Sequence, residues 1–248
     1  MKPLQGRTIL ITRPAEDASS LAETLRERGA NVIEAPAIAI EPLEDATELD
    51  RAIRELAAGE FAWIVFTSPR AVDAVCERLH RFGLPPRVPA KVAAVGPTTA
   101  QNLRDRTIEP DLVADPHTTE ALADQFPSGE GRVLLPRADI APEGLEERFR
   151  EKGWTPVRVD AYRTRYLDEL PPDAAEALHR GDVQAVVFTS SSTVESFLRM
   201  VGERREPDAV AIGPVTAATA RRAGFRVVAV ADPHTVDGIV QALENLLS

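Results

Sequence analysis

The chain contains an internal duplication, and this duplication limits the folds that it can adopt. Three short segments of the first half recur in the same order in the second half: Phe66-Thr67-Ser68 as Phe188-Thr189-Ser190, Val95-Gly96-Pro97 as Ile212-Gly213-Pro214, and Ala114-Asp115-Pro116-His117-Thr118 as Ala231-Asp232-Pro233-His234-Thr235. The spacing between the copies shortens only once, which indicates a small deletion in one connecting loop. A solenoid needs about three or more stacked repeats, so two copies predict a pair of similar lobes.

Each half alternates short apolar runs with segments of helical periodicity. Segments such as 18–28, 71–81 and 145–152 carry leucine or valine every three or four residues, which predicts helices. Continuously apolar strands that alternate with helices are typical of parallel sheets covered on both faces. We therefore expect doubly wound α/β lobes with strands at 8–11, 32–35, 63–66, 92–95, 111–114, 133–135, 157–159, 185–188, 210–212 and 227–230.

The border between the two copies does not look like a domain linker. Residues 127–131 form only a short turn before the strand expected at Val133. By contrast, the runs 35–42 and 160–165 lack helical periodicity and occupy equivalent places in the two halves, so each is expected to be an extended crossover. This pattern predicts a discontinuous first lobe of residues 1–36 and 166–248, a second lobe of residues 42–159, and interlobe linkers at 37–41 and 160–165.

Composition narrows the functional classes. The hydrophobic content of 44% is sufficient for two cores, and the net charge of −10 argues against a nucleic-acid partner, which would require a clustered basic face. Cys76 is the single cysteine, so no intrachain disulfide is expected and a reducing, cytoplasmic location is favoured. The apolar run at residues 9–11 is too short for a signal sequence or a membrane span, so no membrane association is expected.

Four strand-to-helix junctions carry residues that suit anion binding. The junctions lie at residues 68–69, 96–99, 190–192 and 213–216. Serine or glycine fits the N-cap in all four, and proline fits the first turn in three. Amides of a first helical turn bind anions, and ligands of open α/β sheets bind at these strand ends. Ordinary capping explains any one junction, but four at repeat-related positions favour a ligand. The expected binding residues are Ser68, Thr98, Thr99, Ser190, Ser191, Val215 and Thr216.

Other polar residues have more than one interpretation. Arg13 and Arg137 follow equivalent strands, where they are either carboxylate partners of a ligand or members of structural ion pairs, and both roles stay open. The duplicated Asp-Pro-His-Thr segments are interpreted as turns, with Thr118 and Thr235 as N-caps and the histidines as turn residues rather than acids or bases. Cys76 is expected to belong to a core.

Several alternative functions lack the motifs that they need. A dinucleotide-binding fingerprint follows its strand, whereas Gly129-Glu130-Gly131 precedes one and Leu134 occupies the place of the third glycine. The chain has neither a P-loop nor a cluster of metal ligands, so no metal is expected. A two-lobed binding protein of the periplasmic type is a stronger alternative, although it would ordinarily carry an export signal.

Taken in order and spacing, the motifs resemble those of the uroporphyrinogen-III synthases over nearly the whole chain. The matching segments are Ile11-Thr12-Arg13-Pro14, Phe66-Thr67-Ser68-Pro69-Arg70-Ala71-Val72, Val95-Gly96-Pro97-Thr98-Thr99-Ala100, Leu135-Pro136-Arg137, Asp160-Ala161-Tyr162-Arg163-Thr164 and Ile212-Gly213-Pro214-Val215-Thr216-Ala217. The resemblance implies two flavodoxin-like lobes with parallel sheets, two extended linkers, and an active site in the cleft between the lobes.

The resemblance also implies a reaction. It is that of a cyclising hydro-lyase of tetrapyrrole (haem, sirohaem, cobalamin or chlorophyll) biosynthesis, which closes linear hydroxymethylbilane to uroporphyrinogen III with loss of water and inversion of ring D. The implied chemistry passes through an azafulvene cation and a spiro intermediate without any cofactor, so the protein acts chiefly by positioning reactive pyrroles.

Partners and a catalytic residue follow from the same resemblance. It implies a monomer that binds a small-molecule polycarboxylate tetrapyrrole and makes a transient contact with hydroxymethylbilane synthase. It also places Tyr162 near the reacting end of the substrate, which makes Tyr162 the expected catalytic residue. The alternative is a ring packed against one lobe with its hydroxyl in water.

Overall fold

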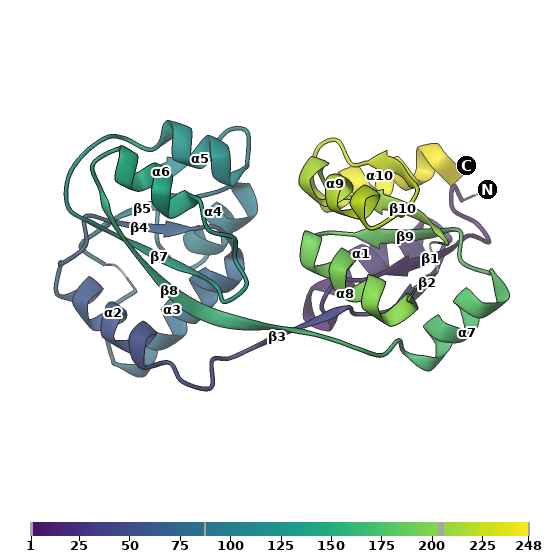
Figure 1. The fold of residues 1–248 in the computed structure, drawn as a ribbon, viewed down its shortest axis with the longest axis horizontal. Coiled ribbons are helices and arrows are strands. Elements are labelled where there is room, and N and C mark those ends of the chain that lie inside the picture. Colours follow the sequence, from purple (N-terminus) through teal and green to yellow (C-terminus); the bar gives the residue numbers. More distant parts are fainter. Residues whose placement is uncertain (1, 87, 203–205, 248) are drawn as a thin grey trace. The chain divides into compact units, whose positions relative to one another are not determined.

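The chain folds into two α/β units, shown as ribbons in Figure 1. This computed structural model describes residues 2–86, 88–202 and 206–247. One unit, lobe 1, comprises Met1–Ile40 and Arg165–Ser248, and the other, lobe 2, comprises Glu41–Thr164. Lobe 1 is therefore built from both ends of the chain, and lobe 2 from its middle.

Lobe 1 contains a parallel sheet in the order β11-β10-β9-β1-β2. Read from its other edge, this is the strand order of flavodoxin-like doubly wound sheets. Its strands are β1 (Thr8–Ile11), β2 (Asn31–Glu34), β9 (Ala185–Phe188), β10 (Asp208–Ala211) and β11 (Val227–Val230), and its helices are α1 (Ala15–Glu27), α7 (Pro172–Arg180), α8 (Ser191–Val201), α9 (Pro214–Arg222) and α10 (Val236–Leu247).

Lobe 2 contains a sheet in the order β3-β8-β7-β4-β5-β6. Except for the edge strand β3, this order is equivalent to that of lobe 1, and the pairs from β8 to β6 are parallel. The strands of this sheet are β3 (Ile38–Glu41), β4 (Trp63–Phe66), β5 (Lys91–Ala94), β6 (Leu112–Val113), β7 (Arg132–Ala138) and β8 (Thr155–Tyr166), and the helices of lobe 2 are α2 (Thr47–Ala57), α3 (Pro69–Arg81), α4 (Pro97–Arg104), α5 (Thr119–Gln125) and α6 (Leu145–Glu151). Strands β3 and β8 run past the bounds of lobe 2 into residues of lobe 1.

The boundaries of the two repeats do not coincide with those of the lobes, because each sheet combines strands from both copies. Lobe 1 joins the β-α-β unit β1-α1-β2 of the first copy to β9, β10 and β11 of the second. Lobe 2 joins the equivalent unit β7-α6-β8 of the second copy to β4, β5 and β6 of the first. The predicted fold class, two α/β lobes with parallel sheets, is confirmed.

Alternating strand residues form two cores in each lobe, one on each face of the sheet. In lobe 1, Ile9 and Ile11 face α1 and α10, while Leu10 faces α7 and α8. Aromatic rings fill the second of these cores, where the ring centroid of Phe188 lies 5.6 Å from Phe197 and 5.2 Å from Phe225. Burial on both faces explains why the strands read as continuous apolar runs.

Three strands differ clearly in length from the prediction. Strand β8 extends through Tyr166, beyond residues 157–159 and across the segment expected to be an extended linker. Strand β7 extends to Ala138 because it pairs with β8 along its whole length. Strand β6 is shortened to Leu112–Val113, since it lies at the edge of the sheet and pairs only with Ala93 and Ala94.

The aromatic core of lobe 1 gives a test of the fold. Phe188→Ala removes a ring that is 0% exposed, and we expect a loss of about 3–5 kcal/mol in the free energy of unfolding. Phe82→Ala, the same change at a partly exposed ring beside Arg54, should cost clearly less. Denaturant unfolding of both variants measures the difference, and equal losses would contradict this assignment of the core.

Candidate functional site

The carboxyl edge of each sheet is followed by helix starts. In lobe 2, helices α3, α4 and α5 begin at the N-caps Ser68, Gly96 and Thr118, and in lobe 1, α8 and α9 begin at Ser190 and Gly213. These are the N-caps that the sequence predicts. Because parallel strands end at the same edge of a sheet, the first-turn amides of each lobe lie along one edge, where open α/β sheets bind ligands.

At the serine junctions the hydroxyls are engaged locally. Ser68 Oγ accepts from the amide of Ala71 at 3.2 Å, and Ser190 Oγ accepts from that of Thr193 at 3.2 Å. The hydroxyl of Ser191 lies 2.9 Å from that of Thr219 and ties the start of α8 to α9. These side chains therefore shape the helix starts.

The two Gly-Pro junctions differ, because no side chain of the described residues caps α4 or α9. At α4, Thr98 is exposed whereas Thr99 is 2% exposed. At α9, Val215 is 65% exposed and Thr216 only 6%. A valine side chain makes no hydrogen bond, so the only polar groups of Val215 are those of its backbone.

Tyr162 sits at a β-bulge in β8. Strand β7 pairs with β8 residue by residue up to Arg137 opposite Asp160, and the next pair is Ala138 opposite Tyr162. Ala161 is therefore an extra residue. Both Ala161 and Tyr162 pack against the core on the α3 face of the sheet, although consecutive residues of a regular strand point to opposite faces.

The phenol of Tyr162 meets the start of α3. Its oxygen lies 3.1 Å from Ser68 Oγ, so the expected catalytic residue and an expected binding residue form one polar pair. Burial raises the pKa of Tyr162, and the nearby Asp139 carboxylate raises it further, while the bond to Ser68 and the charges of Arg70 and Arg137 lower it. With burial as the largest of these effects, the phenol is held in its protonated, hydrogen-bond-donating form at neutral pH.

The two predicted arginines occupy different environments. Arg13 lies just beyond β1 in lobe 1 and is partly exposed, as the sequence predicts. Arg137 lies within β7 rather than beyond it, because pairing with β8 lengthens that strand. Its side chain is 4% exposed, pairs with Glu146 at 3.1 Å and donates to the carbonyl of Pro142 at 2.9 Å. Of the two roles left open by the sequence, this geometry fits the structural ion pair.

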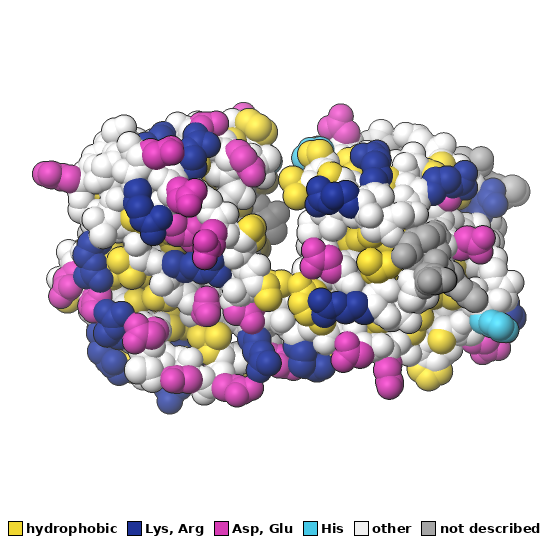
Figure 2. All heavy atoms as spheres, viewed as in Figure 1, with side chains coloured by type: hydrophobic (Ala, Val, Ile, Leu, Met, Phe, Trp, Pro, Cys, Tyr) yellow, Lys and Arg dark blue, Asp and Glu magenta, His cyan; other side chains and the backbone are white. Residues whose placement is uncertain are grey.

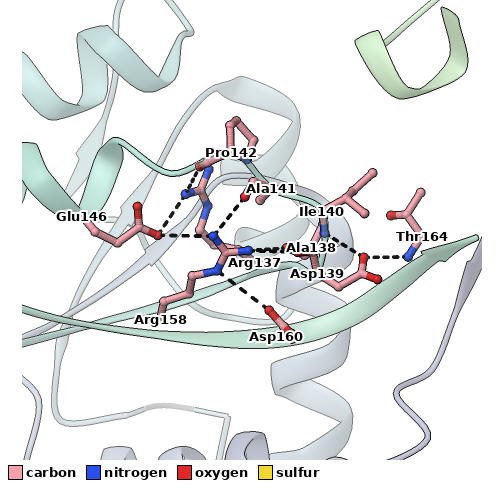
Figure 3. A network of polar contacts seen from close by, with 10 residues as sticks. All are labelled: Arg137, Ala138, Asp139, Ile140, Ala141, Pro142, Glu146, Arg158, Asp160 and Thr164. Carbon is pink, nitrogen blue, oxygen red and sulfur yellow. Dashed lines mark hydrogen bonds and ion pairs between the residues drawn. The ribbon is translucent and has the colours of Figure 1, made fainter. Parts of the chain in front are cut away.

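A polar network around Arg137, drawn in Figure 3, was not predicted from the sequence. Arg158 donates to the carbonyls of Ala141 at 2.9 Å and Asp139 at 3.0 Å, and Asp139 Oδ1 accepts from the amide of Thr164 at 2.9 Å. One signal was present in the sequence: the apolar alternation Val157, Val159, Ala161 is broken by Tyr162, the next residue.

The duplicated turns and the cysteine have structural roles. Nδ1 of His117 lies 2.7 Å from the carbonyl of Ala114, and Nδ1 of His234 lies 2.7 Å from that of Ala231, so both histidines close their turns as predicted. Cys76 packs against the core on the α3 face, and burial raises the pKa of its thiol, which makes it a poor nucleophile.

The surface charge, the candidate metal ligands and the hydropathy of the helices give three further observations. Acidic and basic side chains are interspersed over the displayed face of each lobe, without a basic surface (Figure 2). Over the residues that the structure describes, histidine, cysteine and carboxylate side chains form no group that would hold a metal ion. No helix among residues 2–86, 88–202 and 206–247 has both the length and the apolar character to cross a membrane.

Comparison with known proteins gives consistent matches. The family model described as "Uroporphyrinogen-III synthase HemD" matches residues 19–241. The uroporphyrinogen-III synthase of Synechococcus elongatus is 35% identical over 258 residues, covering 98% of this chain and 97% of that protein. That of Chlorobaculum parvum is 28% identical, with 94% and 95% covered. A solved structure of a mutant uroporphyrinogen III synthase from Thermus thermophilus has a TM-score of 0.70 at 24% identity, covers 97% of this chain and 98% of that one, and shows the same fold.

The environment of Tyr162 predicts that its phenol ionises at a higher pH than a solvated tyrosine. The chain has two tyrosines, so in a Tyr166→Phe variant the tyrosinate absorbance reports Tyr162 alone. Because burial raises the pKa of Tyr162, ionisation should occur at a higher pH than in the urea-unfolded variant, where the value is about 10. The raised pKa of Tyr162 therefore contributes to the free energy of unfolding in full below about pH 10, and this contribution is lost as the pH rises through the folded-state pKa. Equal titration of the folded and unfolded variants would show that the phenol is solvated.

Proposed function

Because this chain belongs to the uroporphyrinogen-III synthase family and acts as a hydro-lyase of tetrapyrrole biosynthesis, we propose how its residues divide the work of that reaction. The substrate is linear hydroxymethylbilane, which is closed to uroporphyrinogen III with loss of water and inversion of ring D. Backbone amides at the starts of α3, α4, α8 and α9 bind the substrate carboxylates, and Tyr162 assists departure of the hydroxyl. Residues 37–41 and 160–165 are the interlobe linkers in this proposal.

Carboxylate recognition by amides suits the charge of the protein. The chain carries a net charge of −10, so a polycarboxylate is not attracted by the molecule as a whole. The amino end of a helix supplies about half a positive charge together with amides that point at the anion. The uncapped starts of α4 and α9 offer these amides without a competing side chain of the described residues. Arg13 adds a side-chain cation for one further carboxylate.

The chemical step requires a hydroxyl group to leave. The lone pair of the pyrrole nitrogen forms a carbon–nitrogen double bond, and the displaced ring π pair forms the exocyclic double bond of the azafulvene cation. The hydroxyl departs with the electrons of its carbon–oxygen bond. A phenol stabilises the developing negative charge by donating a hydrogen bond and need not itself ionise. The observation that carries this assignment is the pair of Tyr162 and Ser68, 3.1 Å apart at the carboxyl edge of lobe 2.

Ser68 has a supporting role in the same proposal. Its oxygen already accepts the amide hydrogen of Ala71, which polarises the hydroxyl and strengthens it as a donor. When Ser68 donates to the oxygen of Tyr162, the phenolic hydrogen stays available for the substrate. Ser68, the start of α3 and Tyr162 thereby act as one chain of hydrogen bonds.

A direct test of the reaction is the isomer ratio. Uncatalysed cyclisation of hydroxymethylbilane gives isomer I, so the purified protein should direct the product to isomer III. A transient contact with hydroxymethylbilane synthase would favour isomer III further by shortening the free lifetime of the bilane. A protein that only bound the bilane would leave isomer I dominant.

Removal of the phenolic hydroxyl should slow turnover and leave the product unchanged. General acid assistance is worth about 10²–10⁴-fold, and pyrrole electrons already help expel the leaving group, so Tyr162→Phe should lower kcat by about 10²-fold or less. Isomer III should persist, because carboxylate contacts fold the substrate. Tyr166→Phe, the same change four residues along the same strand, should keep kcat. A Tyr162→Phe enzyme with the parent's kcat would remove Tyr162 from the mechanism, and a change to isomer I would make its role steric.

Anion recognition at α4 can be tested by adding a competing charge. Thr98→Asp places a carboxylate in the first turn, where it stabilises the helix through the dipole and repels substrate carboxylates. Repulsion of ~1 kcal/mol at about 4 Å in water predicts a KM raised about fivefold at low salt and less at high salt. Thr98→Asn and Thr98→Ala keep the amide and should change KM by less than about twofold. A loss of binding in Thr98→Ala would mean that the side chain is the ligand.

A further inference from the structure

The bulge in β8 decides which face of the sheet Tyr162 occupies. Up to Asp160 the strand alternates regularly, with Val159 in the core on the α3 face and Arg158 on the opposite face toward α6. In a continued alternation Tyr162 would share the face of Arg158 and Asp160, because residues two apart point to the same side. The extra residue Ala161 reverses this phase and brings the phenol to Ser68.

Two hydrogen bonds between Asp139 and β8 hold the chain at the bulge, and a third within the loop orients the Asp139 side chain. Its amide donates to the carbonyl of Tyr162 at 3.2 Å. Its carboxylate oxygen Oδ1 accepts from the amide of Thr164 at 2.9 Å and from that of Ile140 at 2.9 Å (Figure 3). Beyond a bulge the ladder of strand hydrogen bonds is interrupted, so a side-chain acceptor is needed for the amide that the ladder leaves out. Asp139 supplies it.

Asp139 is itself held by the partly buried Arg158, and its loop by the buried Arg137. Arg158 donates to the carbonyls of Ala138 at 3.3 Å and Asp139 at 3.0 Å, which belong to the peptides before and after the Asp139 Cα. Arg137 donates to Pro142 farther along the same loop, and Glu146 lies within ion-pair distance of both arginines. Figure 3 shows these contacts converging on the loop between β7 and α6. The loop therefore has a fixed shape, and Asp139 a fixed direction.

We propose that Asp139 is a positioning residue for catalysis, which holds the β-bulge at Ala161 and so directs Tyr162 toward Ser68 and the leaving hydroxyl. This inference rests on the proposed role of Tyr162. It also gives the ionic network of Arg137, Glu146 and Arg158 a function: the network holds the loop that carries Asp139.

A matched pair of substitutions separates position from charge. Asp139→Asn removes the charge and keeps an oxygen acceptor at the same place, whereas Asp139→Glu keeps the charge and moves the acceptor by one methylene. If position matters, the Asn variant should keep kcat within about twofold of the parent, and the Glu variant should fall to about the kcat of Tyr162→Phe with KM unchanged. Adding Tyr162→Phe to Asp139→Glu should then cost no further activity, because the two changes remove the same interaction.

The titration of Tyr162 gives a readout that does not depend on activity. The charges that act on this phenol belong to Arg70, Arg137 and Asp139, and burial outweighs them in raising its pKa. In a Tyr166→Phe background, Asp139→Glu should lower the pKa of Tyr162 more than Asp139→Asn does, because displacement of the ring exposes it to water. Asp111→Glu is the control, since Asp111 Oδ2 accepts the strand amide of Val92 at 2.8 Å and should affect neither the titration nor kcat.

Each possible result either supports or contradicts the positioning role of Asp139. A parent-like Asn variant and a Glu variant that matches Tyr162→Phe in kcat support it. An impaired Asn variant with a normal Glu variant would overturn it in favour of an electrostatic role, and losses that add to Tyr162→Phe would reduce Asp139 to a structural residue. If Tyr162→Phe alone has full activity, the proposed chemistry fails, whereas an unchanged titration in Asp139→Glu overturns the positioning of the ring.

Discussion

One extra residue in one strand determines which face of the lobe 2 sheet carries the Tyr162 phenol. Ala161 shifts the alternation of β8, so Tyr162 lies beside Ser68 at the start of α3 instead of facing α6 with Arg158 and Asp160. The bulge interrupts strand pairing, and the lost pairing is replaced by Asp139, whose loop is held by buried ionic groups. In our proposal, the buried ion pair of Arg137 and Glu146 serves to place this phenol.

The anion recognition that we propose follows a different principle in the same molecule. An acidic protein that binds a polycarboxylate would need a strong basic pocket if side chains carried the recognition. Helix starts avoid this, because their amides are part of the fold and cannot be lost by a change of side chain. The exposed Val215 beside Thr216 illustrates the point: it lies where a ligand contact is expected, and it offers only its backbone for polar contacts.

The features that the sequence could predict are the local ones. The duplication, the apolar strands and the Ser-Pro and Gly-Pro junctions identify two α/β lobes and their helix starts, since each depends on neighbouring residues. The buried state of Arg137 and the role of Asp139 depend on partners that only the sheet brings near, such as Glu146 and Thr164. The break in alternation at Tyr162 was visible in the sequence, but the partner that stabilises it was not.

If the Tyr162 phenol assists departure of the hydroxyl, its effect should depend on how readily the leaving group departs. A bilane in which a carboxylate ester replaces the hydroxyl tests it most directly, because a carboxylate leaves readily without a hydrogen-bond donor. Single-turnover rates of the parent and of Tyr162→Phe should differ with hydroxymethylbilane and become nearly equal with the ester. An equal defect of Tyr162→Phe with both substrates would contradict the account and show that the ring acts by shape.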